Sequence, residues 1–299
     1  MNQVLTFDIG GTNVKYGFFS TEGQLLRSGE IPTEAEKGGP AMIQRLIQFS
    51  RTFSSINRIG ISSAGQIDSK TGRVVFATDA IPGYRGTETG RLFHDALGVS
   101  IAVLNDANAA VLGESLYGAA KGCDTVIGLT YGTGIGGGIV IHHQLFEGST
   151  GIAAEFGHFP IHATTGRRCL CGKIGCYEAY ASTRALLTQI EAGTGKHFSG
   201  RQLFDEDSRI LPEVYPYFED WINEISIGLA GLIHIFNPDC IVLGGGIMQQ
   251  PTVINAVTEN LSAHILPSFF SPCLVPAKLG NMAGLYGAYA KVCQSPIQF

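Results

Sequence analysis

Charged residues are scarce in this sequence. Asp, Glu, Lys and Arg make up 15% of its 299 residues and hydrophobic residues make up 44%, whereas about 25% charged residues is usual in globular proteins. Such a composition excludes intrinsic disorder, which requires low hydrophobicity and high charge. Proline is also scarce, with 12 residues, and the glycines follow no G-X-Y period. Collagen and low-complexity linkers are therefore excluded.

Basic clusters and long apolar runs are missing as well. No run of Lys or Arg exceeds the pair Arg167 and Arg168, and the net charge is −5, so there is no basic surface for nucleic acid. No apolar stretch reaches the roughly 18 to 20 residues of a membrane span. The N-terminal apolar run has no basic leader and is interrupted by Asp8. We therefore expect a cytoplasmic protein that binds neither nucleic acid nor a membrane.

Cysteine is present in an odd number, seven, without a secretion signal, which argues against a disulfide framework. Cys123, Cys240, Cys273 and Cys293 are isolated along the chain, whereas the other three crowd together in residues 169–176. That crowding needs a separate explanation.

Glycine is abundant, with 40 of 299 residues, where about 7% is usual. We expect the surplus to serve tight turns and close approaches of the backbone. The glycines concentrate where apolar strand patterns end. The loops between strands are therefore the first candidates for ligand binding.

The hydrophobic pattern indicates a mixed α/β chain of about two domains. Residues 3–30 predict a β-meander, and residues 125–148 repeat its order of apolar strand, Gly-rich turn and apolar strand, which suggests a duplicated core with one Gly loop in each half. Further strands are predicted at 56–65, 71–78, 99–106, 240–247 and 275–279, and helices at 41–53, 89–98, 107–122, 221–236, 251–265 and 283–293.

The first Gly loop is DIGGTN at residues 8–13. It places a carboxylate at the end of a strand, then two glycines free to adopt positive φ, then a hydroxyl. Backbone N–H groups of such a loop can approach phosphate oxygens, Thr12 adds a donor, and Asp8 could hold a metal-bound water. A plain hairpin turn is the alternative.

The second Gly loop, YGTGIGGG at 131–138, contains a formal GxGxxG at Gly132, Gly134 and Gly137. A dinucleotide-binding loop must open a helix, whereas the β-branched IVIHHQLF that follows predicts a strand. The loop is therefore interpreted as a hairpin clamp. The chain has no GxxxxGK[ST] motif, so it is not a P-loop protein.

Asp106 stands at the end of the apolar run VSIAVLND and is followed at once by a helical pattern. A carboxylate at the carboxyl end of a strand lies where open α/β sheets bind ligands. It could serve as the base that accepts a hydroxyl proton in phosphoryl transfer. It could equally be the N-cap of the next helix.

The crowded cysteines suggest a metal site. His158 precedes Cys169 by eleven positions, and Cys171 and Cys176 follow in CLCGKIGC, where glycines allow sharp turns. One histidine and three cysteines form a closed set of soft ligands that suits structural Zn²⁺. The alternative is that the histidine is structural and the cysteines are incidental.

Six motifs together resemble the ROK family of sugar kinases and repressors, from Leu5 to the segment at 280–290. The motifs are DIGGT (8–12), NDANAA (105–110), YGTGIGGG (131–138), EFGH (155–158), CLCGKIGCYE (169–178) and NPDCIVLGGGI (237–247). The resemblance implies two actin-like (ribonuclease H-like) ATPase domains with a cleft between them. We place them at residues 1–118 and 119–299, with the zinc segment at 158–178 and the last helix packing back on the N-terminal domain.

The resemblance also implies the site residues. Asp106 would be the general base, with ATP, Mg²⁺ and structural Zn²⁺ as cofactors. The sugar pocket would be lined by Gly65, Thr78, Asn105, Asp106, Glu155, His158 and Glu178, and the zinc ligands would be His158, Cys169, Cys171 and Cys176. ATP would be bound by Asp8, Gly10, Gly11, Thr12, Asn13, Gly132, Thr133, Gly134, Gly136, Gly137, Gly138 and Gly245. Many relatives have proline where this chain has Ala64, so the contacts next to Gly65 differ.

The function implied is phosphorylation of the 6-hydroxyl of glucose or a related hexose by ATP, in a protein that is a homodimer, as is common in the family. N-acetylmannosamine, fructose and β-glucosides remain open as substrates. A ROK regulator that senses sugar without catalysis is the alternative from another class. Such regulators carry an N-terminal helix-turn-helix, for which a hairpin beginning by residue 4 leaves no room. An actin-like assembly ATPase is disfavoured by the EFGH and CLCGKIGCYE segments.

Overall fold

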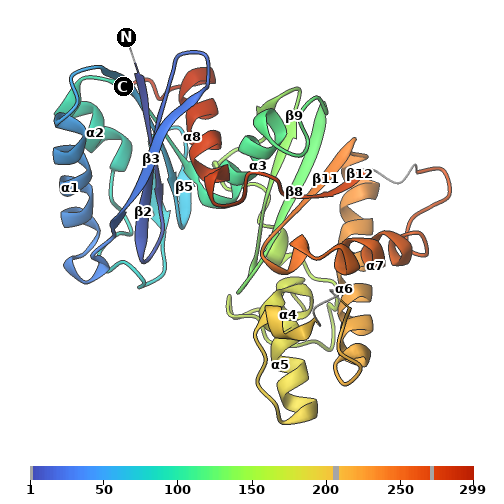
Figure 1. Cartoon of the computed structure of the whole chain (residues 1–299). Coiled ribbons are helices and arrows are strands. Elements are labelled where there is room, and N and C mark those ends of the chain that lie inside the picture. The colour runs from blue at the N-terminus through green and yellow to red at the C-terminus, as the bar shows by residue number, and fades with distance from the viewer. Residues whose placement is uncertain (1–2, 205–208, 270–272) are drawn as a thin grey trace. The chain divides into compact units, whose positions relative to one another are not determined.

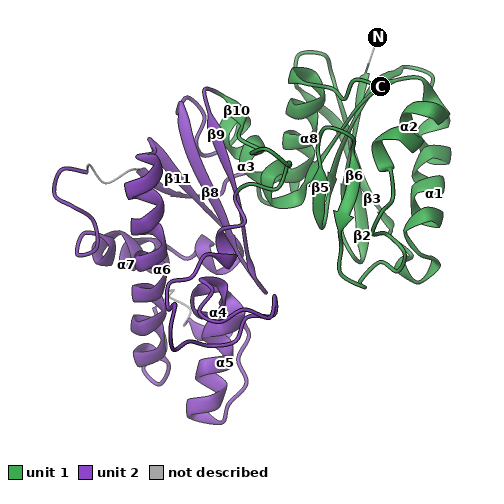
Figure 2. Cartoon of the chain, turned by 180° about the vertical axis from the view of Figure 1, so that it is seen from behind, with its two compact units in different colours: residues 1–118, 143–153, 279–299 green, residues 119–142, 154–278 purple. Residues whose placement is uncertain are grey.

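The structure is a computed structural model that describes residues 3–204, 209–269 and 273–299. The chain forms two compact units, shown in separate colours in Figure 2. Unit 1 comprises residues 1–118, 143–153 and 279–299, and unit 2 comprises residues 119–142 and 154–278. Each unit has a mixed sheet flanked by helices, so the predicted α/β class is confirmed.

The sheet of unit 1 has the strand order β3-β2-β1-β4-β7. Its first three strands form the predicted antiparallel meander, and β1, β4 and β7 run parallel. The strands of unit 1 are β1 (Gln3–Ile9), β2 (Asn13–Phe19), β3 (Leu25–Pro32), β4 (Ile56–Ser63), β5 (Gln66–Asp68), β6 (Arg73–Phe76), β7 (Ser100–Asn105) and β10 (Gln144–Leu145). The helices of unit 1 are α1 (Gly39–Arg51), α2 (Thr89–Leu97), α3 (Asp106–Tyr117) and α8 (Ala283–Gln294), with short 3₁₀ turns at Ala35–Lys37 and Gly280–Met282.

Helices cover both faces of the unit 1 sheet, with α1 and α2 on one side and α8 on the other (Figure 1). Helix α1 buries Met42, Ile43, Leu46 and Ile47 on one stripe, against strand residues such as Phe7. Each such side chain contributes roughly 1.5 to 3 kcal/mol when fully buried. The opposite face of the sheet packs against Leu285, Tyr289 and Val292 of α8.

Glycines allow α3 and α8 to approach each other closely. A Cβ placed on Gly287 of α8 would lie 1.8 Å from the carbonyl oxygen of Ala109 in α3. A Cβ placed on Gly113 of α3 would lie 2.4 Å from the carbonyl oxygen of Ala283. Part of the glycine surplus therefore serves helix packing.

The strands that unit 2 contributes to its sheet follow the order β9-β8-β11-β12 and repeat the opening of strand, Gly-rich turn and strand. Strands β8 and β9 form an antiparallel hairpin, and β8, β11 and β12 run parallel. The strands are β8 (Thr125–Tyr131), β9 (Ile135–Ile141), β11 (Cys240–Gly244) and β12 (Cys273–Pro276). The helices are α4 (Glu178–Ala181), α5 (Thr183–Thr194), α6 (Tyr215–Phe236) and α7 (Pro251–Leu261), with 3₁₀ turns at Phe156–His158, Gly200–Leu203 and Ile247–Gln249.

Helix α6 supplies much of the unit 2 core, with Ile225, Leu229 and Ile233 buried. It ends at Asn237, which adopts a left-handed φ of 43°, and Pro238 follows. This end matches the predicted stop. Among the described residues no helix is both long and apolar enough to cross a membrane.

Several elements differ from the prediction. Helix α5 was not predicted, although Ser182 caps it by accepting a hydrogen bond from the Ala185 amide and Gly195 ends it in a left-handed conformation. Helix α6 begins six residues before the predicted start at 221, with Pro216 in its first turn. The caps of α5 and the first-turn proline of α6 were signals in the sequence, but polar positions obscured the helical period.

We predict that Gly287→Ala destabilises the protein by about 1 to 3 kcal/mol, because the added methyl group overlaps the α3 backbone and the two helices must separate. Gly231→Ala is the matched control, since a Cβ at this α6 glycine has no atom within 4 Å. That change should be neutral or stabilise by about 0.5 to 1 kcal/mol. Denaturant unfolding compares the two. Equal unfolding midpoints would contradict the close packing.

Candidate active site

The carboxyl ends of the parallel strands of unit 1 lie in register. Ile9 of β1 is opposite Ser63 of β4, which is opposite Asn105 of β7. The Gly turn after β1, the loop at Gly65 after β4 and Asp106 after β7 therefore leave the sheet along the same edge. This is the edge at which open α/β sheets bind ligands.

The first Gly turn joins β1 to β2 as a tight hairpin. The Gly10 amide donates to the carbonyl of Asn13 over 3.1 Å, and the Thr33 hydroxyl donates to the Gly10 carbonyl over 2.7 Å. Gly11 and Thr12 are exposed. Gly10 and Gly11 are free to adopt positive φ, but neither does. At Gly10, a side chain would be only 3.1 Å from the Asn13 carbonyl, so space is the constraint.

Asp8 is held at this edge by two neighbours that the sequence analysis did not identify. The Ser62 hydroxyl donates to Asp8 Oδ1 over 2.6 Å, and Lys15 Nζ lies 3.6 Å from Oδ2. Lys15 is opposite Asp8 in the β1–β2 register, and Ser62 is opposite it in the β1–β4 register. Their positions could have been found from the strand pairing alone.

Asn105, not Asp106, is the N-cap of α3. Its Oδ1 accepts from the amides of Ala107 and Asn108, over 2.9 and 3.1 Å. Its Nδ2 donates to the Gly65 carbonyl over 2.8 Å and to Asp106 Oδ1 over 2.9 Å. The four hydrogen-bonding positions of this side-chain amide are thus filled by the protein. Asn105 is placed to orient the site, and the N-cap alternative for Asp106 is wrong.

Asp106 occupies the first position of α3, where its side chain reaches the surface and the surrounding protein removes part of its solvation. The Ala107 amide also donates to Oδ1, over 2.9 Å, so both donors lie on one carboxylate oxygen. Loss of solvation, with a smaller contribution from the negative charge of Asp8, raises the pKa of Asp106 to about 6, against the lowering effect of these hydrogen bonds. A carboxylate with such a pKa suits general base catalysis near neutral pH.

Gly65 adopts a φ of 99°, and a Cβ there would lie 2.5 Å from the Phe76 carbonyl oxygen. The loop after β4 is therefore held against the end of β6. Thr78 follows two residues after β6 and is exposed. This contact brings the segment that carries Thr78 to the Gly65 loop.

The second Gly turn connects β8 to β9 in unit 2, so the hairpin interpretation of the GxGxxG motif is confirmed. Gly132 and Thr133 are exposed at the turn. A Cβ on Gly134 would lie 2.6 Å from Glu178 Oε2, whereas a Cβ on Gly132 would meet nothing within 4 Å. The three following glycines lie inside β9. Gly136 is half-buried, Gly137 and Gly138 are buried, and the Phe156 ring fills the space beside Gly137.

A cavity of about 740 Å³ opens beside the turn of unit 2. Gly245, which follows β11 with a φ of 107°, packs so closely that a Cβ would lie 2.1 Å from the Tyr131 carbonyl oxygen. The cavity is lined by Tyr131, Gly132, Thr133, Thr183, Arg184, Leu187, Ser199, Gly200, Arg201, Gly246, Ile247, Gln249 and Gln250. Its volume suits a nucleotide-sized ligand. The lining that α5 contributes was not predicted, because the helix itself was not predicted.

Glu178 links three features of unit 2. Its Oε2 accepts from the Ile135 amide, at the end of the Gly turn, over 3.3 Å. Its Oε1 accepts from the Cys169 thiol over 2.9 Å and lies 3.9 Å from His158 Nδ1. Glu155 Oε2 lies 3.9 Å from His158 Nε2. The structure thus brings Glu155, His158 and Glu178 together.

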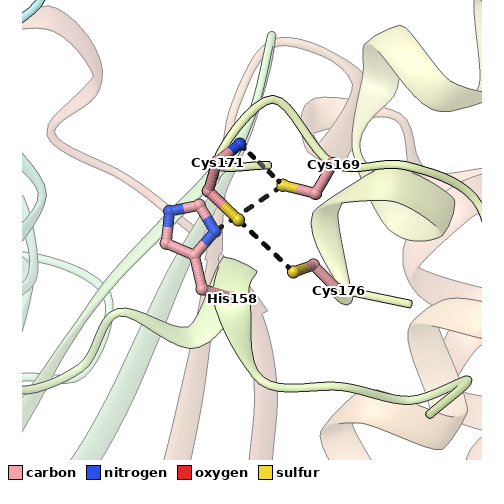
Figure 3. A group of neighbouring side chains, drawn as sticks. All are labelled: His158, Cys169, Cys171 and Cys176. Atoms are coloured by element: carbon pink, nitrogen blue, oxygen red, sulfur yellow. Dashed lines mark hydrogen bonds between the residues drawn. The ribbon is translucent and has the colours of Figure 1, made fainter. Parts of the chain in front are cut away.

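His158, Cys169, Cys171 and Cys176 converge on one point (Figure 3), and their ligand atoms all lie within 4.8 Å of one another. His158 Nδ1 is 3.8 Å from Cys169 Sγ, and Cys171 Sγ is 3.6 Å from Cys176 Sγ. In a tetrahedral zinc site with Zn–S bonds of about 2.3 Å, neighbouring ligands are about 3.8 Å apart. The donor set and its spacing therefore fit Zn²⁺.

Positive φ at two glycines lets the cysteine segment fold back. Gly172 has a φ of 86° and Gly175 a φ of 80°. A Cβ on Gly175 would lie 1.8 Å from the carbonyl oxygen of His162. Both positions therefore require glycine, which accounts for their spacing among the cysteines.

Comparison with known proteins places these features in a family. The chain is 32% identical over 305 residues to a glucokinase of Thermotoga maritima, with 96% of each covered. The structure is similar to a ROK hexokinase of Thermus thermophilus, with 32% identity, a TM-score of 0.85 and 96% of each chain covered. It is also similar to a ROK family glucokinase of Streptomyces griseus in complex with glucose and AMPPNP, with 29% identity, a TM-score of 0.78, and 96% and 98% of the two chains covered. The ROK family model matches residues 4–295, and the chain therefore belongs to the ROK family.

Proposed function

We propose that this chain transfers the γ-phosphoryl group of ATP to the 6-hydroxyl of glucose or a closely related hexose. Membership of the ROK family and 32% identity to a glucokinase make it a sugar kinase. The position of Asp106 is the observation that supports its assignment as the general base. It stands at the edge where the parallel strands of unit 1 end in register, with a pKa raised to about 6.

ATP would be bound through both Gly turns. In unit 1 the exposed backbone of Gly11 and Thr12 would contact phosphate oxygens, and in unit 2 that of Gly132 and Thr133 would do so. The cavity beside the second turn would receive the nucleoside, and its two arginines, Arg184 and Arg201, supply positive charge. The ATP analogue named with the Streptomyces griseus glucokinase supports this use of the fold.

Asp8 is the residue that we propose to face Mg²⁺, through bound water. The ion, when present with ATP, would neutralise the charge that develops on the phosphates. Ser62 and Lys15 hold the Asp8 carboxylate in position. The residues fit such a role because a carboxylate oxygen is the ligand type that Mg²⁺ prefers.

Asp106 would accept the proton of the sugar hydroxyl as it attacks the γ-phosphorus. Both hydrogen bonds to its carboxylate lie on Oδ1, so we assign Oδ2 as the oxygen that receives the proton. Asn105 fixes the carboxylate through Nδ2 and also holds the Gly65 loop. Phosphoryl transfer depends mainly on positioning, and this amide supplies it for Asp106.

The sugar would be recognised by Glu155, His158 and Glu178 from unit 2, and by the Gly65 loop and Thr78 from unit 1. Carboxylates that bridge neighbouring hydroxyls discriminate strongly, because a missing or misplaced hydroxyl leaves a polar group unpaired. Glu178 is buried and shares its carboxylate with the Ile135 amide. Its position therefore depends on the Gly turn as well as on the cysteine segment.

Zn²⁺ would be held by His158, Cys169, Cys171 and Cys176. An ion with four protein ligands has no position left for substrate, so its contribution is structural. One of these ligands also belongs to the proposed sugar pocket, because His158 lies within 3.9 Å of both Glu155 and Glu178. The metal would thus order sugar-binding side chains without taking part in the reaction.

An assay of ADP release across a panel of sugars tests the proposed function. Glucose should be turned over with Mg²⁺ and ATP, and the product should be the 6-phosphate. N-acetylmannosamine, fructose and β-glucosides are the alternatives, and the sugar with the highest kcat/KM decides among them. A sugar-binding regulator would bind a hexose and release no ADP with any member of the panel.

We expect Asp106→Asn to lower kcat by roughly 10² to 10⁴, because the amide keeps the shape of the carboxylate but cannot accept a proton. Sugar affinity should change little. In the wild type, kcat/KM should rise with pH through about 6, because the carboxylate must be deprotonated and its pKa is raised to about 6. This rise of kcat/KM with pH, the acid limb of the profile, should disappear in Asp106→Asn.

Asp95→Asn is the control for the Asp106 substitution, since Asp95 is exposed on α2 and forms a surface ion pair with Arg91 at 3.5 Å. It should retain wild-type turnover and the same acid limb. Near-normal turnover in Asp106→Asn would reduce Asp106 to a structural residue at the start of α3.

The two glycines of the second turn should respond differently to substitution. Gly132→Ala places a methyl group where no protein atom lies within 4 Å, so only a bound phosphate would meet it. We expect the KM for ATP to rise roughly tenfold or more, because the methyl group would break a hydrogen bond between the backbone and a charged phosphate. The KM for sugar should stay unchanged. Gly134→Ala should raise both constants, because the methyl group displaces Glu178. If both variants raised the two constants together, the turn would be a fold element and not a phosphate clamp.

Loss of one thiol from the cysteine segment should release the metal. We expect Cys176→Ser to lose about one zinc per chain, melt at a lower temperature and raise the KM for sugar by up to about 10²-fold, with a smaller effect on ATP. Cys293→Ser, in unit 1, is the control and should keep its zinc. Metal analysis and thermal melting measure both. A wild type without zinc, or a zinc-free variant with unchanged sugar KM, would contradict the role.

A further inference from the structure

Three cysteines that are isolated in the sequence meet at the amino-terminal end of the unit 2 sheet. Cys240 opens β11 and lies in register with Cys273, which opens β12. Cys123 precedes β8, the strand on the other side of β11. The thiols of Cys123 and Cys273 both lie close enough to the Cys240 thiol to raise its pKa. None of the three belongs to the candidate active site.

The register between β11 and β12 places Cys240 and Cys273 at a separation that a disulfide can span. In-register residues of neighbouring strands are about 4.8 Å apart, and disulfides form at Cα separations of about 4.4 to 6.8 Å. Side chains in register on parallel strands project from the same face of the sheet.

The two thiols differ in access to solvent. Cys240 is 1% exposed, whereas Cys273 is exposed on β12, the last strand in the sheet order. Burial raises the pKa of the Cys240 thiol to about 12, so it is a poor first target for an oxidant. Cys273 is the thiol that a dissolved oxidant reaches first, and Cys240 stands beside it as the resolving thiol.

We propose that Cys240 and Cys273 form a site of reversible oxidation that a peroxide converts to an intrachain disulfide. Cys273 attacks one peroxide oxygen, the O–O bond breaks, and sulfenic acid and water are formed. The sulfur of Cys240 then attacks the sulfenic sulfur, the S–O bond breaks, and a second water leaves with the thiol proton. Two thiols and one hydrogen peroxide thus give one disulfide and two waters. A dithiol reductant reverses the bond by exchange.

This site is separate from the proposed kinase chemistry. The Gly turns of unit 2 follow the carboxyl ends of β8 and β11, whereas the three cysteines lie at the opposite ends of these strands. The five residues of β11 span about 16 Å at 3.3 Å per residue. Oxidation is therefore measured directly at the sulfurs, and activity is not the readout.

Peptide mapping of the peroxide-treated protein tests the proposal. Residues 210–277 contain no Lys or Arg, so trypsin alone leaves Cys240 and Cys273 in one peptide, 210–278. Adding an endoprotease that cuts after Glu separates them, because Glu259 lies between them. Cys240 then falls in peptide 225–259, Cys273 in 260–278 and Cys123 in 122–147. Unreacted thiols are alkylated before digestion, under non-reducing conditions. Cys169, Cys171 and Cys176 fall in other peptides, so their oxidation does not enter the result.

The expected result is a cross-link between peptides 225–259 and 260–278 that a dithiol reductant removes. It should be lost in Cys273→Ser and retained in Cys123→Ser, the matched control from the same cluster. Both substitutions leave the buried Cys240 in place, so both proteins should fold. A link between 122–147 and 225–259 would make Cys123 the partner and overturn the assignment. A covalent dimer on a non-reducing gel, or Cys273 oxidised to sulfinic acid without a link, would also overturn it.

Discussion

The in-register ends of the parallel strands are the constraint on which the candidate site depends. Ile9, Ser63 and Asn105 stand side by side across three strands of unit 1, and Gly244 stands opposite Thr130 in unit 2. These parallel strands are buried on both faces, so their register is set by the packing of apolar side chains on each side of the sheet. The buried apolar faces therefore determine where the polar loops emerge. The loops that carry the functional residues are therefore brought to one edge by the packing of the strands.

Asn105 converts that alignment into a defined orientation. Its side-chain amide caps α3, holds the Gly65 carbonyl and fixes Asp106 Oδ1 at the same time. A side chain with all its hydrogen bonds satisfied has little freedom left. The carboxylate of Asp106 is thus directed by a neighbour, while its raised pKa arises from lost solvation and from Asp8. Orientation and basicity have separate physical sources.

Glu178 plays the corresponding part in unit 2. It joins the amide of Ile135 in the Gly turn to Cys169 and His158 in the cysteine segment. A side chain at position 134 would displace this carboxylate, which occupies the space beside the glycine. One side chain therefore connects the proposed nucleotide turn, sugar pocket and metal site.

The sequence alone determined the α/β class, the two hairpins and the Cys/His set, because each is a local pattern of apolar period, glycine and ligand spacing. It also singled out Asp106, since strand and helix patterns meet there. Tertiary structure decided the rest. The positions of Ser62 and Lys15 beside Asp8, of Glu178 beside Gly134 and of Cys240 beside Cys273 depend on strand pairing between distant segments. Helix α5 and the cavity that it lines also required the fold, because a weak helical period acquires its meaning only when its buried face meets a core. The need for glycine at Gly287 and Gly137 was likewise hidden, since it comes from the backbone or ring that approaches each one in space.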